Sequence, residues 1–133
     1  MDFNTTEELI DDIRRGKMII LIDDEDRENE GDIIMAAEDV TVAQCALTIR
    51  HTTGILCAPM TAERARELEL PRMVKKNQDA NGTAFTVTCD SINTTTGVSA
   101  SDRMRTFHDL ANSKCGASEF NRPGHVFPLI AKP

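Results

Sequence analysis

The segment that decides the fold reads Lys17-Met18-Ile19-Ile20-Leu21-Ile22-Asp23-Asp24-Glu25-Asp26-Arg27-Glu28-Asn29-Glu30-Gly31-Asp32. Its first part, residues 17–22, is an apolar run of strand length, which predicts a strand buried on both faces. A second apolar run at residues 33–37 predicts another strand. The ten residues between them, 23–32, are therefore expected to form a loop that joins two strands.

This acidic loop, residues 23–32, carries most of the net charge of the protein. The 133-residue chain has 15 Lys and Arg against 22 Asp and Glu, a formal net charge of −7, and the loop holds seven of the acids and one base, Arg27. Carboxylates this close raise one another's pKa values unless a cation neutralises them. The loop therefore favours a hard cation such as Mg²⁺ or Mn²⁺, with Arg27 as an anion ligand or an internal counter-ion.

Two other interpretations of the acidic loop stay open. A solvated loop without a ligand is the ordinary explanation of a charge run. A calcium-binding EF-hand that starts at Asp26 would need a bidentate Glu at its twelfth position, where the sequence has Ala37, and a helix after it instead of a strand. The calcium loop is therefore disfavoured.

Length and composition indicate one soluble domain, residues 1–133. Hydrophobic residues make up 40% and charged residues 28% of the chain, as in globular proteins. No apolar run approaches the roughly 20 residues of a membrane span, and no signal peptide is visible. The acidic balance argues against nucleic-acid partners, which need basic patches. We expect a cytoplasmic protein whose four cysteines are reduced thiols, mostly in the core.

Caps and periodicity predict alternating helices and strands. Helix starts are expected at Thr5, Thr41 and Ser99, each with a partner three residues later, and a charged surface helix over residues 61–70. Further strands are expected over residues 54–58, 84–89 and 124–130, and a polar loop over residues 72–83. The order is not a regular βαβ series, so we predict an α+β fold: a mixed sheet covered by helices in a layered α/β/α-type arrangement.

Three further features outside the acidic loop could carry chemistry. His125 lies in a Pro-Gly frame before a strand and is either a general acid/base or a structural histidine. The other two histidines are weaker candidates: His51 lies at a helix end, and His108 lies in the Ser99 helix and is expected at the surface. Cys57 ends a strand and is read as a core cysteine. The hydroxyl-rich residues 94–99 precede a helix, as a phosphate or polyol site or as an ordinary capped loop.

The chain resembles the 3,4-dihydroxy-2-butanone 4-phosphate synthase family of riboflavin biosynthesis. The acidic loop is the most specific part of the resemblance. The other parts are Ile49-Arg50-His51 with Gly54-Ile55-Leu56-Cys57, Gly82-Thr83-Ala84-Phe85-Thr86-Val87, Thr95-Thr96-Gly97-Val98-Ser99-Ala100-Ser101-Asp102-Arg103 and Arg122-Pro123-Gly124-His125-Val126-Phe127-Pro128-Leu129.

The resemblance implies conversion of D-ribulose 5-phosphate to 3,4-dihydroxy-2-butanone 4-phosphate and formate with Mg²⁺, or alternatively Mn²⁺. It also implies a homodimer with the active site near the interface. Carried over by motif position, the metal ligands are Glu28 and Glu30, with Glu28 also among the residues that bind the substrate. Substrate contacts are expected from Arg27, Asp32 and Thr96. Catalytic roles are expected for Asp23, Glu30, Cys57 and His125.

Members of this family extend further than this sequence. Their additional part carries an Arg-x-Gly-His-Thr-Glu motif that supplies phosphate and metal contacts, and some members continue into a GTP cyclohydrolase II domain. We therefore expect residues 1–133 to be the N-terminal two-thirds of a synthase domain, with weak or no activity alone. The alternative is a non-catalytic synthase-like protein that pairs with a full-length homologue or only binds divalent cations.

Overall fold

The structure, a computed structural model, describes residues 3–133 as five helical segments and five strands. In chain order they are α1 (Thr6–Arg14), β1 (Ile19–Ile22), β2 (Gly31–Ile34), α2 (Val42–His51), β3 (Cys57–Met60), α3 (Ala62–Glu67), β4 (Cys89–Ser91), α4 (Ala100–Ala111), the 3₁₀ helix η1 (Ala117–Glu119) and β5 (Phe120–Ile130). This interleaving confirms the predicted α+β class.

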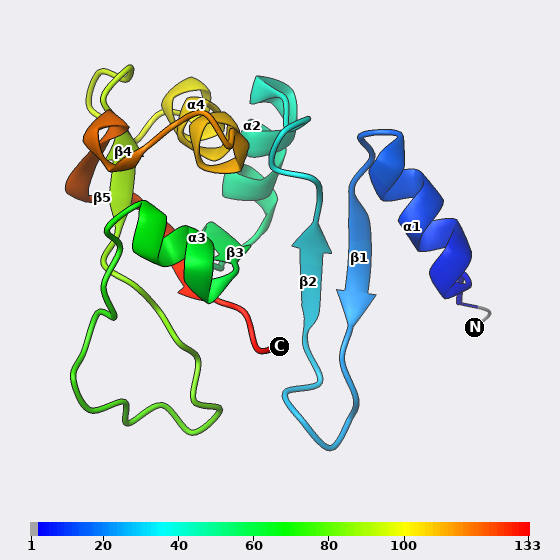
Figure 1. Ribbon diagram of the computed structural model, residues 1–133. Helices are drawn as coiled ribbons and strands as arrows, with labels where there is room; N and C mark the ends of the chain where they lie inside the picture. Colours follow the sequence, from blue (N-terminus) through cyan, green and yellow to red (C-terminus); the bar gives the residue numbers. More distant parts are fainter. Residues whose placement is uncertain (1–2) are drawn as a thin grey trace.

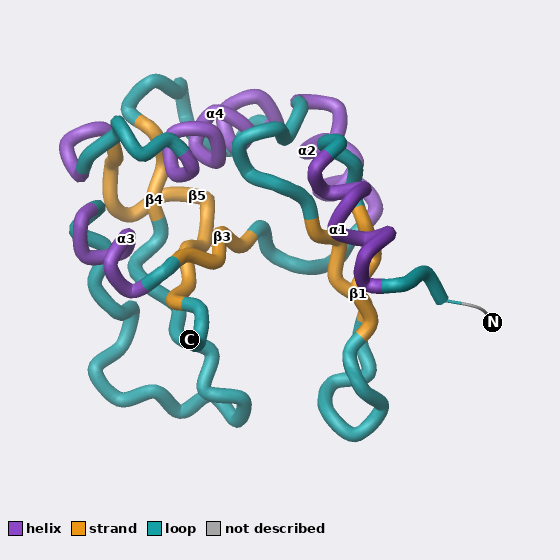
Figure 2. The backbone as a smooth tube through the Cα atoms, turned by 45° about the vertical axis from the view of Figure 1, so that its right-hand side comes forward, coloured by secondary structure: helices purple, strands orange, loops and turns teal. Residues whose placement is uncertain are grey.

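The strands form two separate sheets (Figure 1). β5 lies at the centre of a three-stranded mixed sheet, parallel to β3 and antiparallel to β4, while β1 and β2 form an antiparallel hairpin. α4 packs on β4, β5 and α2, and α1 packs on β1. Figures 1 and 2 show two long loops, the acidic loop and residues 72–83, extending at the same end of the molecule.

Local capping signals set the helix starts as predicted. Thr5 and Thr41 each accept a hydrogen bond from the backbone N–H three residues later, and the side chain at that later position bonds back to the cap, forming capping boxes. Ser99 accepts from the Asp102 N–H in the same way at the start of α4. These contacts need only neighbouring residues, which is why the sequence alone predicts them.

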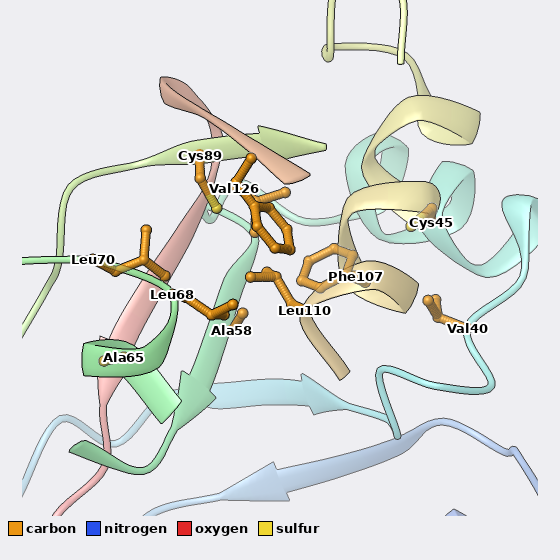
Figure 3. Close-up of a cluster of buried hydrophobic side chains, with 11 residues drawn as sticks. Val40, Cys45, Ala58, Ala65, Leu68, Leu70, Cys89, Phe107, Leu110 and Val126 are labelled. Atoms are coloured by element: carbon orange, nitrogen blue, oxygen red, sulfur yellow. The ribbon is translucent and has the colours of Figure 1, made fainter. Parts of the chain in front are cut away.

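The hydrophobic core lies between the mixed sheet and the helices (Figure 3). Val126 of β5, Cys89 of β4, Phe107 and Leu110 of α4 and Leu68 after α3 are buried together. Val126 and Leu68 have no exposed surface. β5 therefore anchors the core by its inward residues.

The predicted two-sided burial of residues 17–22 is wrong. Ile19 is buried, but Ile20 is 67% and Leu21 48% exposed. The reason is that, within the described chain, β1 pairs only with β2, and its main packing contact outside the hairpin is with α1. β2 also begins at Gly31 instead of residue 33, because its register with β1 joins Gly31 to Ile22.

Three other predicted elements have different bounds. β3 covers Cys57–Met60 instead of residues 54–58, because these four residues pair with residues 127–130 of β5. The helix predicted over residues 61–70 ends at Glu67, and Leu68 and Leu70 turn into the core. β5 begins at Phe120, before the predicted residue 124.

The strand predicted over residues 84–89 is mostly wrong. The regular strand there is β4, Cys89–Ser91, and Phe85 and Thr86 form only isolated bridges, Phe85 with Leu129 and Thr86 with Arg72. Thr86 donates to the carbonyl of Pro128 at 3.0 Å, but Pro128 has no N–H to return the bond. The ladder is therefore interrupted at this proline.

Across residues 3–133, none of the helices combines the length and apolar character needed to cross a bilayer.

Leu68→Ala is expected to lower the free energy of unfolding by about 2–5 kcal/mol, because it removes a fully buried side chain from the core. Leu47→Ala is the matched control: its side chain is 41% exposed on α2, and we expect a change within about 0.5 kcal/mol. Urea unfolding measures both. Equal losses for the two variants would contradict the placement of the core.

Candidate functional site

The acidic loop is organised around the carboxylate of Asp23. Its Oδ1 accepts the Glu30 N–H at 2.8 Å, and its Oδ2 accepts the Glu28 N–H at 3.1 Å. The Asp23 N–H in turn donates to the Glu30 carbonyl at 3.3 Å. One side chain at the end of β1 therefore closes the loop that leads into β2.

Arg27 neutralises part of this charge. Its Nε lies 2.7 Å from Asp23 Oδ2 and its Nη1 lies 3.4 Å from Glu28 Oε1, so the internal counter-ion expected from the sequence is present. Burial acts to raise the pKa of Asp23, but the N–H groups of Glu30 and Glu28 and the Arg27 charge outweigh it and lower that pKa. Asp23 therefore stays anionic and is a weak proton acceptor.

Glu28 links the acidic loop to the loop of residues 72–83. Its Oε1 accepts a hydrogen bond from Asn81 Nδ2, between residues far apart in the sequence. A groove of about 250 Å³ lies beside this second loop, lined by Arg72, Lys76 and Phe85 among others. No predicted site residue lines that groove.

The predicted metal ligands, Glu28 and Glu30, are both exposed. Their oxygen donors suit Mg²⁺, which proteins often hold through one or two carboxylates together with water and substrate oxygens. Within residues 3–133, no three His, Cys, Asp or Glu side chains converge closely enough to hold a metal. The carboxylate oxygens of the loop therefore suit magnesium, but Glu28 and Glu30 provide only part of a ligand set.

Cys57 stands where β3 meets β5. It pairs with Phe127, and this pair is the first of the regular β3–β5 ladder. Burial, and next the Asp32 carboxylate, raise the pKa of the Cys57 thiol. Cys57 is only half-buried, unlike the core residue Cys89, whose pKa is raised to about 12, chiefly by burial. Asp32 of the hairpin therefore acts electrostatically on Cys57 of the mixed sheet.

His125 lies two residues before Phe127 on β5. Its Nδ1 is 2.8 Å from Asp90 Oδ2, and its backbone N–H donates to Asp90 Oδ1 at 2.7 Å. His108, expected at the surface, is instead half-buried, with Nε2 2.7 Å from the Val40 carbonyl. His51 ends α2, as expected, and is exposed.

Thr96 is exposed in the loop before α4, and two backbone donors of that loop, the N–H groups of Thr95 and Gly97, already have an acceptor. Asp102 Oδ2 accepts the Thr95 hydroxyl at 2.8 Å and the Gly97 N–H at 3.0 Å. The Thr95 hydroxyl, with these N–H bonds, lowers the pKa of Asp102 against the effect of burial. Of the two interpretations of this loop, the contacts support the capped loop.

The site residues thus fall into two groups. The first group lies in the acidic loop and contains Asp23, Arg27, Glu28 and Glu30. The second group lies in or next to the mixed sheet and contains Cys57, His125 and Thr96. Asp32 lies on β2 of the hairpin and acts electrostatically on Cys57. Asp90 and Asn81 also belong to these contacts, although neither was predicted from the sequence. Asp90 directly follows the β-rich residues 84–89, and a carboxylate buried at such a place needs a polar partner, which could have marked it as a site residue. For Asn81 the sequence indicated only a turn.

Fold and site together define an α+β protein that combines a carboxylate-rich hairpin loop with a histidine backed by a buried aspartate. The chain belongs to the 3,4-dihydroxy-2-butanone 4-phosphate synthase family, whose family model matches residues 7–133. The synthase of Pseudomonas aeruginosa is 51% identical over 134 residues, and that of Klebsiella pneumoniae is 52% identical over 132 residues.

Solved structures agree with this assignment. A crystal structure of 3,4-dihydroxy-2-butanone 4-phosphate synthase in complex with two magnesium ions superimposes with a TM-score of 0.95 at 46% identity, over 98% of this chain and 61% of that one. The sequence match covers 100% of this chain but 37% of the Pseudomonas relative, and 98% of this chain but 61% of the Klebsiella relative. The chain therefore spans about two-fifths to three-fifths of the length of these relatives.

We expect the order of the acidic loop to depend on pH through Asp23. Because the folded pKa of Asp23 is lowered, its hydrogen bonds stabilise the loop fully above the ordinary Asp value and are lost as the pH falls through the folded value. Amide hydrogen exchange of Glu28 and Glu30 measures this. In Asp23→Asn these amides should exchange severalfold faster at neutral pH and lose the acid transition, because the charged acceptor is gone.

Asp24→Asn is the matched control, since Asp24 is an exposed neighbour in the same loop. It should leave both amides protected. Equal acceleration in the two variants would show that general loop charge, and not the Asp23 carboxylate, orders the loop.

Proposed function

We propose that this chain provides the acidic-loop part of a magnesium-dependent synthase that converts D-ribulose 5-phosphate to 3,4-dihydroxy-2-butanone 4-phosphate and formate in riboflavin biosynthesis. The observation that carries the proposal is the family match over residues 7–133, which includes every residue of the two site groups. The neighbouring synthase structure with two magnesium ions supports the cation. We assign the activity to the cytoplasm, with Mn²⁺ as the alternative metal.

The proposed reaction requires protons to leave and return beside a carbonyl. His125 suits this work because its ring is partly exposed while Asp90 occupies its Nδ1, which leaves Nε2 to accept and return a proton. Asp23, with its lowered pKa, is a weaker base. We therefore assign proton transfer to His125 and the ordering of the loop to Asp23.

The acidic loop would hold the metal through Glu28 and Glu30. A bound Mg²⁺ supplies Lewis-acid polarisation of neighbouring substrate oxygens. The raised pKa of Cys57 keeps its thiol neutral at pH 7, so we assign Cys57 to lining the pocket beside Asp32 and not to nucleophilic attack. Arg27 and Thr96 would contact the substrate's polar oxygens.

We further propose that residues 1–133 form one domain that needs the additional length of its relatives for full activity. The greater length of the relatives supports this requirement, since the match covers 61% of the Klebsiella pneumoniae synthase. The exposed Ile20, Leu21 and Ile22 of β1 support pairing with a second copy, since such a row of apolar side chains favours an interface. Non-catalytic pairing with a longer homologue is the alternative function, and the same exposed strand supports it.

A chimera in which residues 1–133 replace the matched segment of the Klebsiella pneumoniae relative should release formate from D-ribulose 5-phosphate, while the 133-residue chain alone should release little. EDTA should abolish release, and added Mg²⁺ should restore it, because the loop carboxylates bind the metal. Formate assays measure each step. A correctly folded chimera without activity would favour the non-catalytic alternative.

His125→Ala in this chimera should lower turnover by about 10²–10⁴-fold, the usual contribution of a positioned acid–base group. The control is His51→Ala, which changes an exposed histidine at the end of α2 and should leave turnover within about twofold. Steady-state kinetics of formate release distinguishes them. Near-normal turnover of the His125 variant would remove this residue from the mechanism.

A further inference from the structure

The Asp90 carboxylate and His125 form a two-point contact between β4 and β5. Asp90 is only 7% exposed, and both of its oxygens face His125: Oδ1 accepts the backbone N–H at 2.7 Å, and Oδ2 lies 2.8 Å from Nδ1. The imidazole side chain itself is 43% exposed. The buried Asp90 carboxylate thus contacts the Nδ1 side of the His125 ring, while the rest of the ring is partly exposed to solvent.

An interruption of the β4–β5 ladder creates this contact. Cys89 pairs with Val126, but the next residue, Asp90, pairs with Asn121, so residues 122–125 of β5 have no partner on β4. The backbone N–H of His125 is therefore not used by the ladder and donates to the Asp90 side chain instead. Such bulges turn a side chain away from its regular direction.

Two glycines make room for the arrangement. A Cβ at Gly124 would lie 2.1 Å from the carbonyl carbon of Cys89, and a Cβ at Gly97 would lie 2.0 Å from Asp90 Oδ2. Gly97 also has a φ of +84°, a conformation that other residues rarely adopt. The backbone at Gly97 therefore confines the Asp90 carboxylate, while the backbone at Gly124 packs closely against the Cys89–Asp90 peptide.

The chemistry of the pair determines where the proton of the ring lies. An ionised carboxylate only accepts hydrogen bonds, so a neutral imidazole that bonds to it must carry its proton on Nδ1. The lone pair of Nε2 is then directed away from Asp90. We propose that Asp90 is a positioning residue that holds neutral His125 in the Nδ1–H tautomer, so that Nε2 exchanges protons with substrate; the catalytic use of this tautomer rests on the proposed function.

The other buried carboxylates of this region have different partners. Asp109 accepts the Ser91 hydroxyl at 2.5 Å and the Arg105 Nε at 3.2 Å, and Asp102 accepts the loop donors before α4. Both join elements within the core. Asp90 differs because its partner is a partly exposed imidazole ring.

Long-range ¹H–¹⁵N NMR of the histidine rings in the 133-residue chain tests the tautomer directly. At alkaline pH, where the rings are neutral, His125 should show a protonated Nδ1 and an unprotonated Nε2. In Asp90→Asn the amide can donate to Nδ1, and His125 should lose the Nδ1–H signal in favour of Nε2–H. An Nε2–H tautomer in the unaltered chain would overturn the proposal without reference to any variant.

Two controls separate this effect from general disturbance. His108 provides an internal one, because its Nε2 bonds to the Val40 carbonyl and should remain Nε2–H in every variant. Asp109→Asn removes a different buried charge next to β4 and should leave the His125 tautomer unchanged. Loss of the Nδ1–H signal in Asp109→Asn as well would overturn the specific role of Asp90.

Kinetics in the active chimera then tests the use of the tautomer. Asp90→Asn should lower kcat by about 10²–10⁴-fold with little change in KM, because the substrate contacts remain while the base carries its proton on the wrong nitrogen. If Asp90→Asn shifts the tautomer of His125 but leaves kcat unchanged, the proposed use of the Nδ1–H tautomer in catalysis is overturned. An inactive chimera whose His125 still shows Nδ1–H would count against the proposed function and leave the Asp90–His125 assignment intact.

Discussion

The structure depends on β5 as the only strand of the described chain that pairs on both sides. Its register with β3 sets Cys57 beside Phe127, and its register with β4 sets Cys89 beside Val126. Val126 also points into the core against α4, so the same strand fixes the sheet and the helix layer. A shift of β5 by one residue would exchange its buried and exposed faces and would move His125 away from Asp90.

The acidic loop solves a different physical problem, the mutual repulsion of seven carboxylates in ten residues. Asp23 satisfies backbone donors that a hairpin of this length would otherwise leave to water, and Arg27 offsets charge within the loop. Glu28 is tied to Asn81, which connects the loop to residues 72–83. The remaining carboxylates stay exposed, which is the state in which hard cations and their waters can reach them.

Sequence reasoning succeeded where a structure is decided by neighbouring residues. The caps at Thr5, Thr41 and Ser99 involve partners three residues away, and the sequence shows both members of each pair. It failed for β1, whose burial depends on how many elements cover the hairpin, and for residues 84–88, whose pairing is broken by a proline on a distant strand. The family motifs identified His125, but Asp90 lies 35 residues away and becomes its partner only through the β4–β5 register.

The two site groups also differ in how firmly the fold holds them. His125 lies on the central strand and is held by the buried Asp90 carboxylate, with two glycines in close contact with β4. The acidic loop, in contrast, extends from a hairpin in which β1 is largely exposed. Proton transfer needs a fixed geometry, because its rate falls steeply with misplacement of the reacting groups. Metal and substrate binding tolerates a loop that becomes ordered around its ligand, provided that Asp23 keeps the backbone closed. The rigid sheet therefore suits the proposed acid–base role of His125, and the exposed hairpin suits the proposed cation site.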